Sequence, residues 1–326
     1  MDLKGKVAVI TGAASGIGRA TALKFHAEGA AGVVVADMNE AGLQSVAQAV
    51  NGLAVRCDVS READIQALVA AAEKRYGRVD VFFSNAGIGN SQGAEPDDEM
   101  WDKMWKIHLM AHVWAARALV EKMIARGEGY FLITASAAGL LNIVESAAYG
   151  VTKHAAVAFA EWLSIAYGRR GLHVSCLCPQ AVRTGMVPGD GGSAGGDGIL
   201  SAEVVADEIV KVMATEKFLV LPHPDVLNYM RTKTDDYDRW LGGMQKLFLK
   251  TQPRVDCGGR CSGRNADRLA RGAADAGSGA SRAGVHRRRH RLWVGRALGF
   301  SPRPQERTDP NAVAGPCTDG LSLRGV

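Results

Sequence analysis

Short apolar runs alternate along the chain with longer stretches of helical periodicity. The apolar runs occupy residues 6–10, 32–36, 53–57, 79–84, 129–134, 172–178 and 217–221. Runs that lack polar alternation are typical of strands buried on both faces of a parallel sheet. Because helical stretches lie between them, we expect parallel pairing through right-handed crossovers. The pattern therefore predicts an α/β fold with a doubly wound parallel sheet of about seven strands and helices on both faces.

The first apolar run leads straight into a glycine-rich turn. Residues 11–18 read Thr-Gly-Ala-Ala-Ser-Gly-Ile-Gly, and a helical stretch follows over residues 19–28. Glycine permits unusual dihedral angles and lets the backbone approach a pyrophosphate, which the N–H groups at the helix start can bind. An isolated glycine cluster is equally consistent with an ordinary strand-to-helix turn, but the flanking strand and helix favour a dinucleotide. The predicted phosphate site consists of Gly12, Ser15, Gly16, Ile17 and Gly18.

The second apolar run ends in an acidic residue, Asp37. A carboxylate at this position accepts hydrogen bonds from the adenosine ribose hydroxyls and repels a 2′-phosphate. Ser15 and Met38 occupy the places where a basic residue would bind that phosphate. Asp37 also suits the N-cap of the following helix, and the two roles are compatible. The sequence favours NAD over NADP.

A serine, a tyrosine and a lysine form a candidate catalytic group. Tyr149 and Lys153 are four residues apart, so on a helix both side chains lie on one face, and Ser136 follows the apolar run 129–134. A nearby cation favours the phenolate and brings a tyrosine of pKa about 10 toward a useful range for acid–base chemistry. Ser136 would hold a substrate oxygen while Tyr149 moves the proton. A Tyr-x-x-x-Lys match by itself would more often be a surface pair.

Together these motifs, in their order along the chain, resemble the short-chain dehydrogenase/reductase family, with a Rossmann-like fold, over about residues 4–220. The resemblance also rests on Asp58, on the Asn-Ala-Gly at 85–87, and on the Pro179-x-x-x-x-Thr184 spacing. It implies that Asp58 contacts the adenine, that Thr184 holds the nicotinamide amide and that Lys153 also binds the nicotinamide ribose. The other implied cofactor contacts are Val59, Asn85, Ala86, Gly87, Tyr149, Pro179 and Val182.

The chain departs from the family pattern at two positions. His108 takes the place of an asparagine that, in the family, maintains a water relay to the lysine. Histidine can both donate and accept a hydrogen bond, so His108 is either a working substitute, counted here with the catalytic residues, or a packed side chain. Gln180 replaces the usual glycine after Pro179. Its side chain either narrows the substrate cleft or points to solvent.

The substrate pocket is expected near a glycine-rich loop at residues 187–198 and a later segment that ends near Lys250. Leu141, Gln180 and Met186, with Ser136, are the candidate substrate-binding residues. The loop composition permits closure, and the later segment is expected to be helical. Two helices, predicted over 101–123 and 146–167, pair with a second subunit in the family, which implies a homodimer or homotetramer. The same apolar residues are equally suited to face their own sheet.

Composition changes abruptly near residue 251. The chain has 326 residues and a net charge of +5, but residues 252–326 contain 14 Arg, no Lys and 6 acidic residues. This segment therefore carries +8 and the preceding residues carry −3. The predicted organisation is one domain, residues 1–250, followed by an irregular tail, 251–326, that is disordered or is the product of an out-of-frame reading. Nucleic-acid binding through the arginines and a zinc site from Cys257, Cys261, His286 and His290 are the less favoured alternatives.

These observations predict an NAD-dependent oxidoreductase that interconverts a secondary alcohol and a ketone, with Tyr149 as general acid/base. The alternative is a non-catalytic nucleotide-binding scaffold or sensor of the same fold. No metal site is predicted, and no signal peptide or transmembrane stretch is visible. Cysteines at 57, 176 and 178 in predicted strands fit core packing in a reducing cytoplasm.

Overall fold

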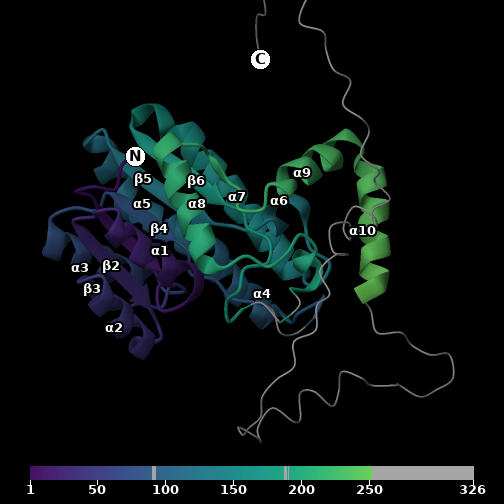
Figure 1. Cartoon of the computed structure of the whole chain (residues 1–326), viewed down its shortest axis with the longest axis horizontal. Helices are drawn as coiled ribbons and strands as arrows, with labels where there is room; N and C mark the ends of the chain where they lie inside the picture. Colours follow the sequence, from purple (N-terminus) through teal and green to yellow (C-terminus); the bar gives the residue numbers. More distant parts are fainter. Residues whose placement is uncertain (90–92, 187–188, 190, 252–326) are drawn as a thin grey trace, which may run out of the picture.

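The computed structural model describes residues 1–89, 93–186, 189 and 191–251. Within these residues the predicted parallel sheet is confirmed, with strand order β3-β2-β1-β4-β5-β6-β7 (Figure 1). The strands are β1 Val7–Thr11, β2 Gly32–Asp37, β3 Leu53–Arg56, β4 Val81–Ser84, β5 Gly129–Thr134, β6 Leu172–Leu177 and β7 Leu219–Val220. The predicted tail lies outside the described residues except for Thr251, which ends the last helix.

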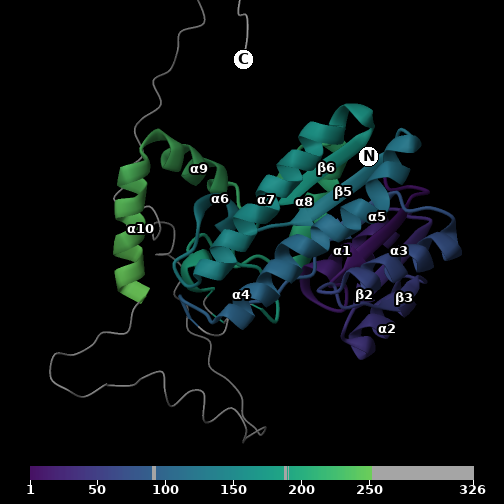
Figure 2. The same ribbon diagram turned by 180° about the vertical axis from the view of Figure 1, so that it is seen from behind.

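Helices cover both faces of the sheet (Figures 1 and 2). They are α1 Gly16–Ala27, α2 Glu40–Ala49, α3 Glu62–Tyr76, α4 Asp98–Trp105, α5 Ala111–Ala125, α6 Ala138–Leu141, α7 Ala147–Tyr167, α8 Ala202–Thr215, α9 Asp225–Asp235 and α10 Tyr237–Thr251. Apolar residues of α1, α2 and α8 pack on one face, and those of α3, α5 and α7 pack on the other. The α9–α10 pair lies beside α6, at the end of the molecule away from β3 (Figures 1 and 2).

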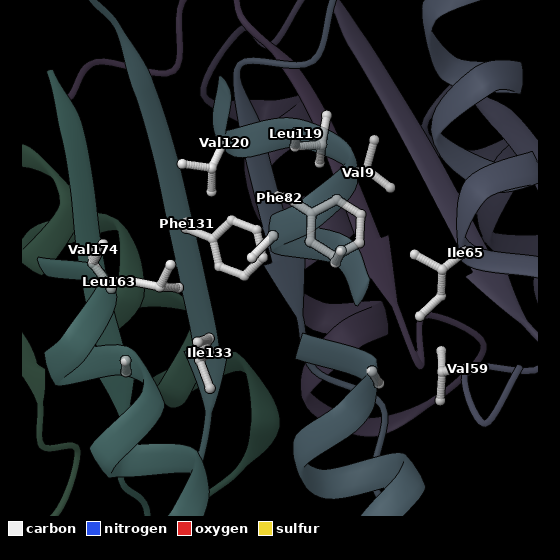
Figure 3. Close-up of a cluster of buried hydrophobic side chains, with 14 of the residues drawn as sticks. Val9, Val59, Ile65, Phe82, Leu119, Val120, Phe131, Ile133, Leu163 and Val174 are labelled. Atoms are coloured by element: carbon white, nitrogen blue, oxygen red, sulfur yellow. The ribbon is translucent and has the colours of Figure 1, made fainter. Parts of the chain in front are cut away.

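Alternate side chains of each central strand enter the two cores. In β4, Val81 and Phe83 face the α1 and α8 side, while Phe82 belongs to the other cluster. Figure 3 shows that second cluster, in which the rings of Phe82 and Phe131 stack with centroids 5.4 Å apart. Fully burying such a side chain contributes about 1.5–3 kcal/mol. The continuous apolar runs of the sequence are therefore explained by burial on both faces.

The chain adds strands to the sheet on one side of β1 first and then on the other side. The β1 strand pairs with β2 on one side and with β4 on the other. In a doubly wound sheet this switch point leaves a crevice at the carboxyl ends of the strands, where ligands bind. The glycine-rich turn after β1 opens into this crevice.

The helix predicted over 101–123 differs in detail from the structure. The structure has α4, a π-helical turn over Lys106–Met110, and then α5. Helix α4 begins earlier than predicted because the Asp97 side chain accepts a hydrogen bond from the Met100 N–H and caps it. A π-helical turn is one residue wider than an α-helical turn and occurs frequently at functional sites. It places His108 inside the molecule.

The segment before Lys250, predicted to be helical, forms two helices, α9 and α10. No helix among the described residues is both long and apolar enough to cross a bilayer. The same residues contain no cluster of three or more His, Cys, Asp or Glu arranged to hold a metal ion.

Candidate active site

The glycine-rich turn is held against the sheet at contact distance. Gly12 has φ +65°, and a Cβ atom there would lie 2.8 Å from the Ala86 Cα. A side chain on Gly18 would collide with the Gly12 carbonyl oxygen. Only glycine satisfies both positions, so the first turn of α1 packs tightly under the loop. Gly18 thus packs against the Gly12 carbonyl and does not line the crevice.

Asp37 ends β2, and its carboxylate is fixed by two backbone groups. Its Oδ2 accepts from the Ala14 N–H at 3.0 Å and its Oδ1 accepts from the Asn39 N–H at 3.0 Å. The N-cap of α2 is Asn39, whose side chain accepts from the Gly42 N–H at 3.2 Å. The expectation that Asp37 itself caps this helix was wrong, because the chain runs two residues further before α2 begins.

Asn85 links three strands at the switch point. Its Nδ2 donates to the Thr11 carbonyl at 3.0 Å, and its Oδ1 accepts from the Thr134 hydroxyl at 3.0 Å. The Thr11 hydroxyl in turn accepts from the N–H groups of Asn85 and Ala86. No role was inferred for Thr11 or Thr134 from the sequence, although each closes an apolar strand with a hydroxyl. The three side chains fix the carboxyl ends of β1, β4 and β5 relative to one another.

Asp58 follows β3 and makes hydrogen bonds to residues close to it in the sequence. Its Oδ1 accepts from the Ser60 N–H at 3.0 Å and from the Ser60 hydroxyl at 2.7 Å. Its own N–H donates to Asp64 Oδ2 at 3.0 Å. The carboxylate therefore keeps one fixed orientation at the rim of the crevice.

Two cavities occupy the carboxyl edge of the sheet. The larger has a volume of about 530 Å³ and runs from Asp37 and Asp58 to Thr184. All of the predicted cofactor-binding residues except Gly18 line it. The smaller, of about 430 Å³, is lined by the predicted substrate residues Ser136, Leu141, Gln180 and Met186. Ser136 and Tyr149 line both cavities, so the two candidate sites meet at these hydroxyls.

Ser136, Tyr149 and Lys153 converge as the sequence predicted. Ser136 lies just beyond β5, where its Oγ accepts from the Ala138 N–H at 3.1 Å and donates to the Pro179 carbonyl at 3.4 Å. Tyr149 lies in the first turn of α7, whose N-cap is Ser146. One turn later, Lys153 Nζ donates to the Thr134 carbonyl at 3.0 Å and lies 5.6 Å from the centroid of the Tyr149 ring.

Burial dominates the electrostatics of this group. It lowers the pKa of Lys153 to about 8, because the ammonium is far from water. It also raises the pKa of Tyr149, and a hydrogen bond with Ser136 opposes this rise. The expected lowering of the tyrosine pKa is not seen in this structure, because burial of the phenol is the largest effect on it.

His108 bridges the loop after β4 and helix α7. Its Nε2 accepts from the Ile88 N–H at 3.1 Å, so its Nδ1 carries the proton that faces the Thr152 hydroxyl at 3.0 Å. The Thr152 hydroxyl donates onward to the Ala148 carbonyl at 2.7 Å. Burial lowers the pKa of His108 well below its usual value, so the ring is neutral. His108 does not line either cavity, and its ring stands edge-on to that of Tyr149.

A second buried histidine lies one turn further on and was missed in the sequence. His112 Nδ1 hydrogen-bonds the Ser84 hydroxyl at 2.6 Å, and burial lowers the pKa of His112 to about 3. Its Nε2 has no hydrogen-bond partner among the described residues. The spacing His108-x-x-x-His112 on a helix was the available signal.

Gln180 and His223 meet behind the smaller cavity. The Gln180 N–H donates to His223 Nδ1 at 3.2 Å, so this histidine, which follows β7, anchors the start of the loop that carries Thr184. Gln180 contributes to the walls of both cavities, so it lies between the two candidate sites.

Comparison with known proteins gives consistent matches. A family model described as short chain dehydrogenase matches residues 6–191. The 1-deoxy-11-beta-hydroxypentalenate dehydrogenase of Streptomyces exfoliatus is 35% identical over 247 residues, which are 72% of this chain and 90% of the relative.

Two solved structures show the same arrangement. A short-chain dehydrogenase/reductase from Burkholderia phymatum, in complex with NAD, has a TM-score of 0.66 and 29% identity, over 78% of this chain and 99% of that chain. A 3-ketoacyl-(acyl-carrier-protein) reductase from Brucella melitensis, complexed with NADH, has a TM-score of 0.63 and 29% identity, over 67% of this chain and 96% of that chain.

Proposed function

The chain belongs to the short-chain dehydrogenase family, and from that premise we propose that it is an NAD-dependent enzyme that interconverts a secondary alcohol and a ketone. Its relatives are dehydrogenases and reductases, so the chain is an oxidoreductase. One observation carries the finer proposal: Ser136 and Tyr149 stand where the two cavities meet. A substrate hydroxyl in the smaller cavity can therefore reach them beside a cofactor in the larger one.

The larger cavity fits a dinucleotide. Gly12 and Gly16 have positive φ angles, and the cradle between them and Ala86 has no room for a Cβ on Gly12. The N-terminus of α1 supplies N–H groups for the pyrophosphate. The Asp37 carboxylate lies at one end for the adenosine ribose, and Lys153 and Thr184 lie at the other for the nicotinamide half.

The surroundings of Asp37 support NAD in preference to NADP. The carboxylate is held in place by Ala14 and Asn39, so it cannot easily turn away from a 2′-phosphate. Its neighbour Met38 is exposed and uncharged. No lysine or arginine other than Lys153 lines the larger cavity among the described residues. A 2′-phosphate would meet a negative charge with no compensating cation.

In the oxidation direction, Tyr149 takes the proton of the substrate hydroxyl while Ser136 holds its oxygen. A nicotinamide held between Lys153 and Thr184 would supply the acceptor for the hydride of the alcohol carbon. The Ser136 Oγ is oriented by the Ala138 N–H and the Pro179 carbonyl, so it is preorganised for this contact. The Lys153 ammonium, one turn from Tyr149, stabilises the developing phenolate. In the reduction direction, the Tyr149 hydroxyl returns the proton.

His108 acts through this group as a positioning residue. It ties Ile88, next to the larger cavity, to Thr152 on the helix that carries Tyr149 and Lys153. Both ring nitrogens make hydrogen bonds, and the ring is neutral. His108 therefore fixes the position of helix α7 relative to the loop that follows β4. This role replaces the relay of the family asparagine with a direct hydrogen-bonded bridge.

A second copy of the chain is the proposed partner. The outer side of α7 carries apolar side chains that are exposed in the described structure, including Trp162, Val151 and Ile165, the last 83% exposed. Large exposed apolar groups that gather on one helix mark interaction surfaces. A homodimer or homotetramer would cover them.

We also place the protein in the cytoplasm, where the described cysteines Cys57, Cys176 and Cys178, all free thiols, would stay reduced.

A direct spectrophotometric assay tests the proposed reaction. The full chain is mixed with NAD and a panel of secondary alcohols, and NADH formation is followed by its ultraviolet absorbance. Binding of NAD is measured separately by titration calorimetry. NADH formation with at least one alcohol is the expected result. NAD binding without turnover of any alcohol would instead favour the non-catalytic scaffold.

A further inference from the structure

The smaller cavity lies between the catalytic hydroxyls and the two last helices. Its near end is formed by Ser136 and Tyr149, and its far end by α10, through Trp240, Met244 and Leu247. These three α10 residues are spaced by four and three positions, so they lie on one face of the helix. Figure 1 shows α10 standing beyond α6 at this end of the molecule.

The far wall is held in a fixed position. Trp240 is buried in a cluster with Ala137, Leu141 and Val226, which joins α10 and α9 to α6. Lys233 Nζ donates to the Leu140 carbonyl at 2.8 Å, and the Tyr229 hydroxyl donates to Asp197 at 3.0 Å. The α9–α10 pair is therefore attached both to α6 and to the loop before α8. A wall anchored in this way limits the size of what can bind.

The lining of this cavity is apolar and has no positive charge. Its apolar lining residues include Leu141, Ile143, Met186, Trp240, Met244 and Leu247. No lysine, arginine or histidine lines it among the described residues, and Glu145 is its one acidic group there. Both Glu145 oxygens accept hydrogen bonds from Ser193, from the N–H at 2.8 Å and from the hydroxyl at 2.7 Å. A negatively charged ligand would meet one carboxylate and no cation.

We propose that this site takes a neutral, largely apolar alcohol or ketone with a carbon skeleton of fused-ring size, and that α10 sets the upper limit of that size. The proposal rests on the proposed function. A water-sized group occupies about 30 Å³, so a cavity of about 430 Å³ holds about 14 such groups. A tricyclic alcohol of about 15 non-hydrogen atoms matches this volume.

The first experiment compares neutral ring alcohols of increasing size with the full chain and NAD. The probes are cyclohexanol, bicyclic 2-decalol and a tricyclic perhydrophenanthrenol. Each added ring carbon that is buried is expected to raise kcat/KM about fourfold. The bicyclic alcohol has four more ring carbons than cyclohexanol, so it should exceed cyclohexanol by about 250-fold, and the tricyclic alcohol should be better still. A kcat/KM that stays level or falls with ring number would overturn the inference while leaving the proposed function intact.

A pair of probes with the same ring but different charge tests the polarity of the cavity. The probes are 4-hydroxycyclohexanecarboxylate and its methyl ester, which have the same ring and reacting carbon. Burial of an unpaired carboxylate is costly, so the ester should exceed the acid in kcat/KM by about a hundredfold or more. If the carboxylate were oxidised with the same kcat/KM as the ester, the proposal that the substrate is neutral would be contradicted. If no probe of either set is oxidised, the proposed function fails and this inference fails with it.

Two tryptophan variants on α10 test the wall. Leu247 lines the cavity and is 6% exposed, whereas Leu241 is 46% exposed and outside the lining. Leu247→Trp should lower the ratio of kcat/KM for the tricyclic alcohol to that for cyclohexanol by about tenfold or more. Leu241→Trp is the matched control and should leave the ratio unchanged. Equal ratios in both variants and the parent would show that α10 does not limit the substrate.

Discussion

Replacement of Lys153 by methionine should stabilise the protein at neutral pH while removing its activity. The Lys153 side chain is 3% exposed, and burial lowers its pKa from 10.5 to about 8. Because one pKa unit corresponds to about 1.36 kcal/mol, keeping this proton at neutral pH costs the fold about 3 kcal/mol. Methionine fills a similar space without a charge, but it leaves the Thr134 carbonyl without its donor, which costs about 1 kcal/mol. The expected net gain is about 2 kcal/mol.

The gain in the free energy of unfolding from Lys153→Met should shrink as the pH rises. Between the folded-state pKa of about 8 and the unfolded value of 10.5, the unfolded chain binds the Lys153 proton and the folded chain does not. Wild-type stability therefore rises with pH across this window, and the cost of the buried charge is fully present only below it. The advantage of Lys153→Met should fall by about 2 kcal/mol between about pH 7 and pH 9.5. Removing this lysine also changes the electrostatics of His108, His112 and Cys176, but all three buried side chains stay neutral across this pH range in both proteins.

Urea unfolding, followed by tryptophan fluorescence at several pH values, measures this difference. Lys211→Met is the matched control, since the Lys211 side chain is 73% exposed and its Nζ lies 3.7 Å from a carboxylate oxygen of its i,i+3 neighbour Glu208. The control should show no such change with pH. A stability difference for Lys153→Met that stays constant over this range, or that grows with pH, would refute the claim that burial lowers the pKa of Lys153.

Three further predictions concern the cofactor, the bridging histidine and the acid–base group. Asp37→Ala combined with Met38→Arg should shift the ratio of kcat/KM toward NADP, and an unchanged ratio would show that Asp37 is not at the ribose. His108→Asn should retain most activity, whereas His108→Leu should lose rate with little change in NAD affinity, because leucine can neither accept from Ile88 nor bond to Thr152. Equal rates in both variants and the parent would remove His108 from the mechanism. Since burial raises the pKa of Tyr149, alcohol oxidation should accelerate as the pH rises above neutrality, whereas ketone reduction should slow only as the pH approaches that raised pKa; parallel pH profiles for the two directions would contradict this assignment.

The sheet could be predicted because its signals are local. The apolar run at 6–10 and the glycine-rich turn after it depend only on burial and backbone geometry, and the structure places β1 and α1 there. The meeting of Ser136, Tyr149 and Lys153 followed from helical spacing and the end of one strand. Such features are written in consecutive residues, so periodicity and motif spacing suffice to find them.

Features that depend on packing between distant segments could not be predicted. The π-helical turn at His108 is stabilised by hydrogen bonds to Ile88 and Thr152, which are far away in the chain. The raised pKa of Tyr149 arises from burial by several elements, which no spacing of charges reveals. The apolar cavity requires α10 to fold back onto α6 through Trp240, and the sequence indicated only a helical segment near the substrate mouth.

The central claim is that Tyr149 carries the substrate proton, and a single hydroxyl tests it. Tyr149→Phe should keep its fold and its NAD affinity but lose about two or more orders of magnitude in kcat for an alcohol that the parent oxidises. Tyr167→Phe, at the far end of the same helix, is the matched control and should oxidise that alcohol at the parental rate. The decisive measurement is the rate of NADH formation by Tyr149→Phe at saturating NAD and alcohol. A loss confined to this variant is the predicted result, and a near-normal rate would mean that another group moves the proton.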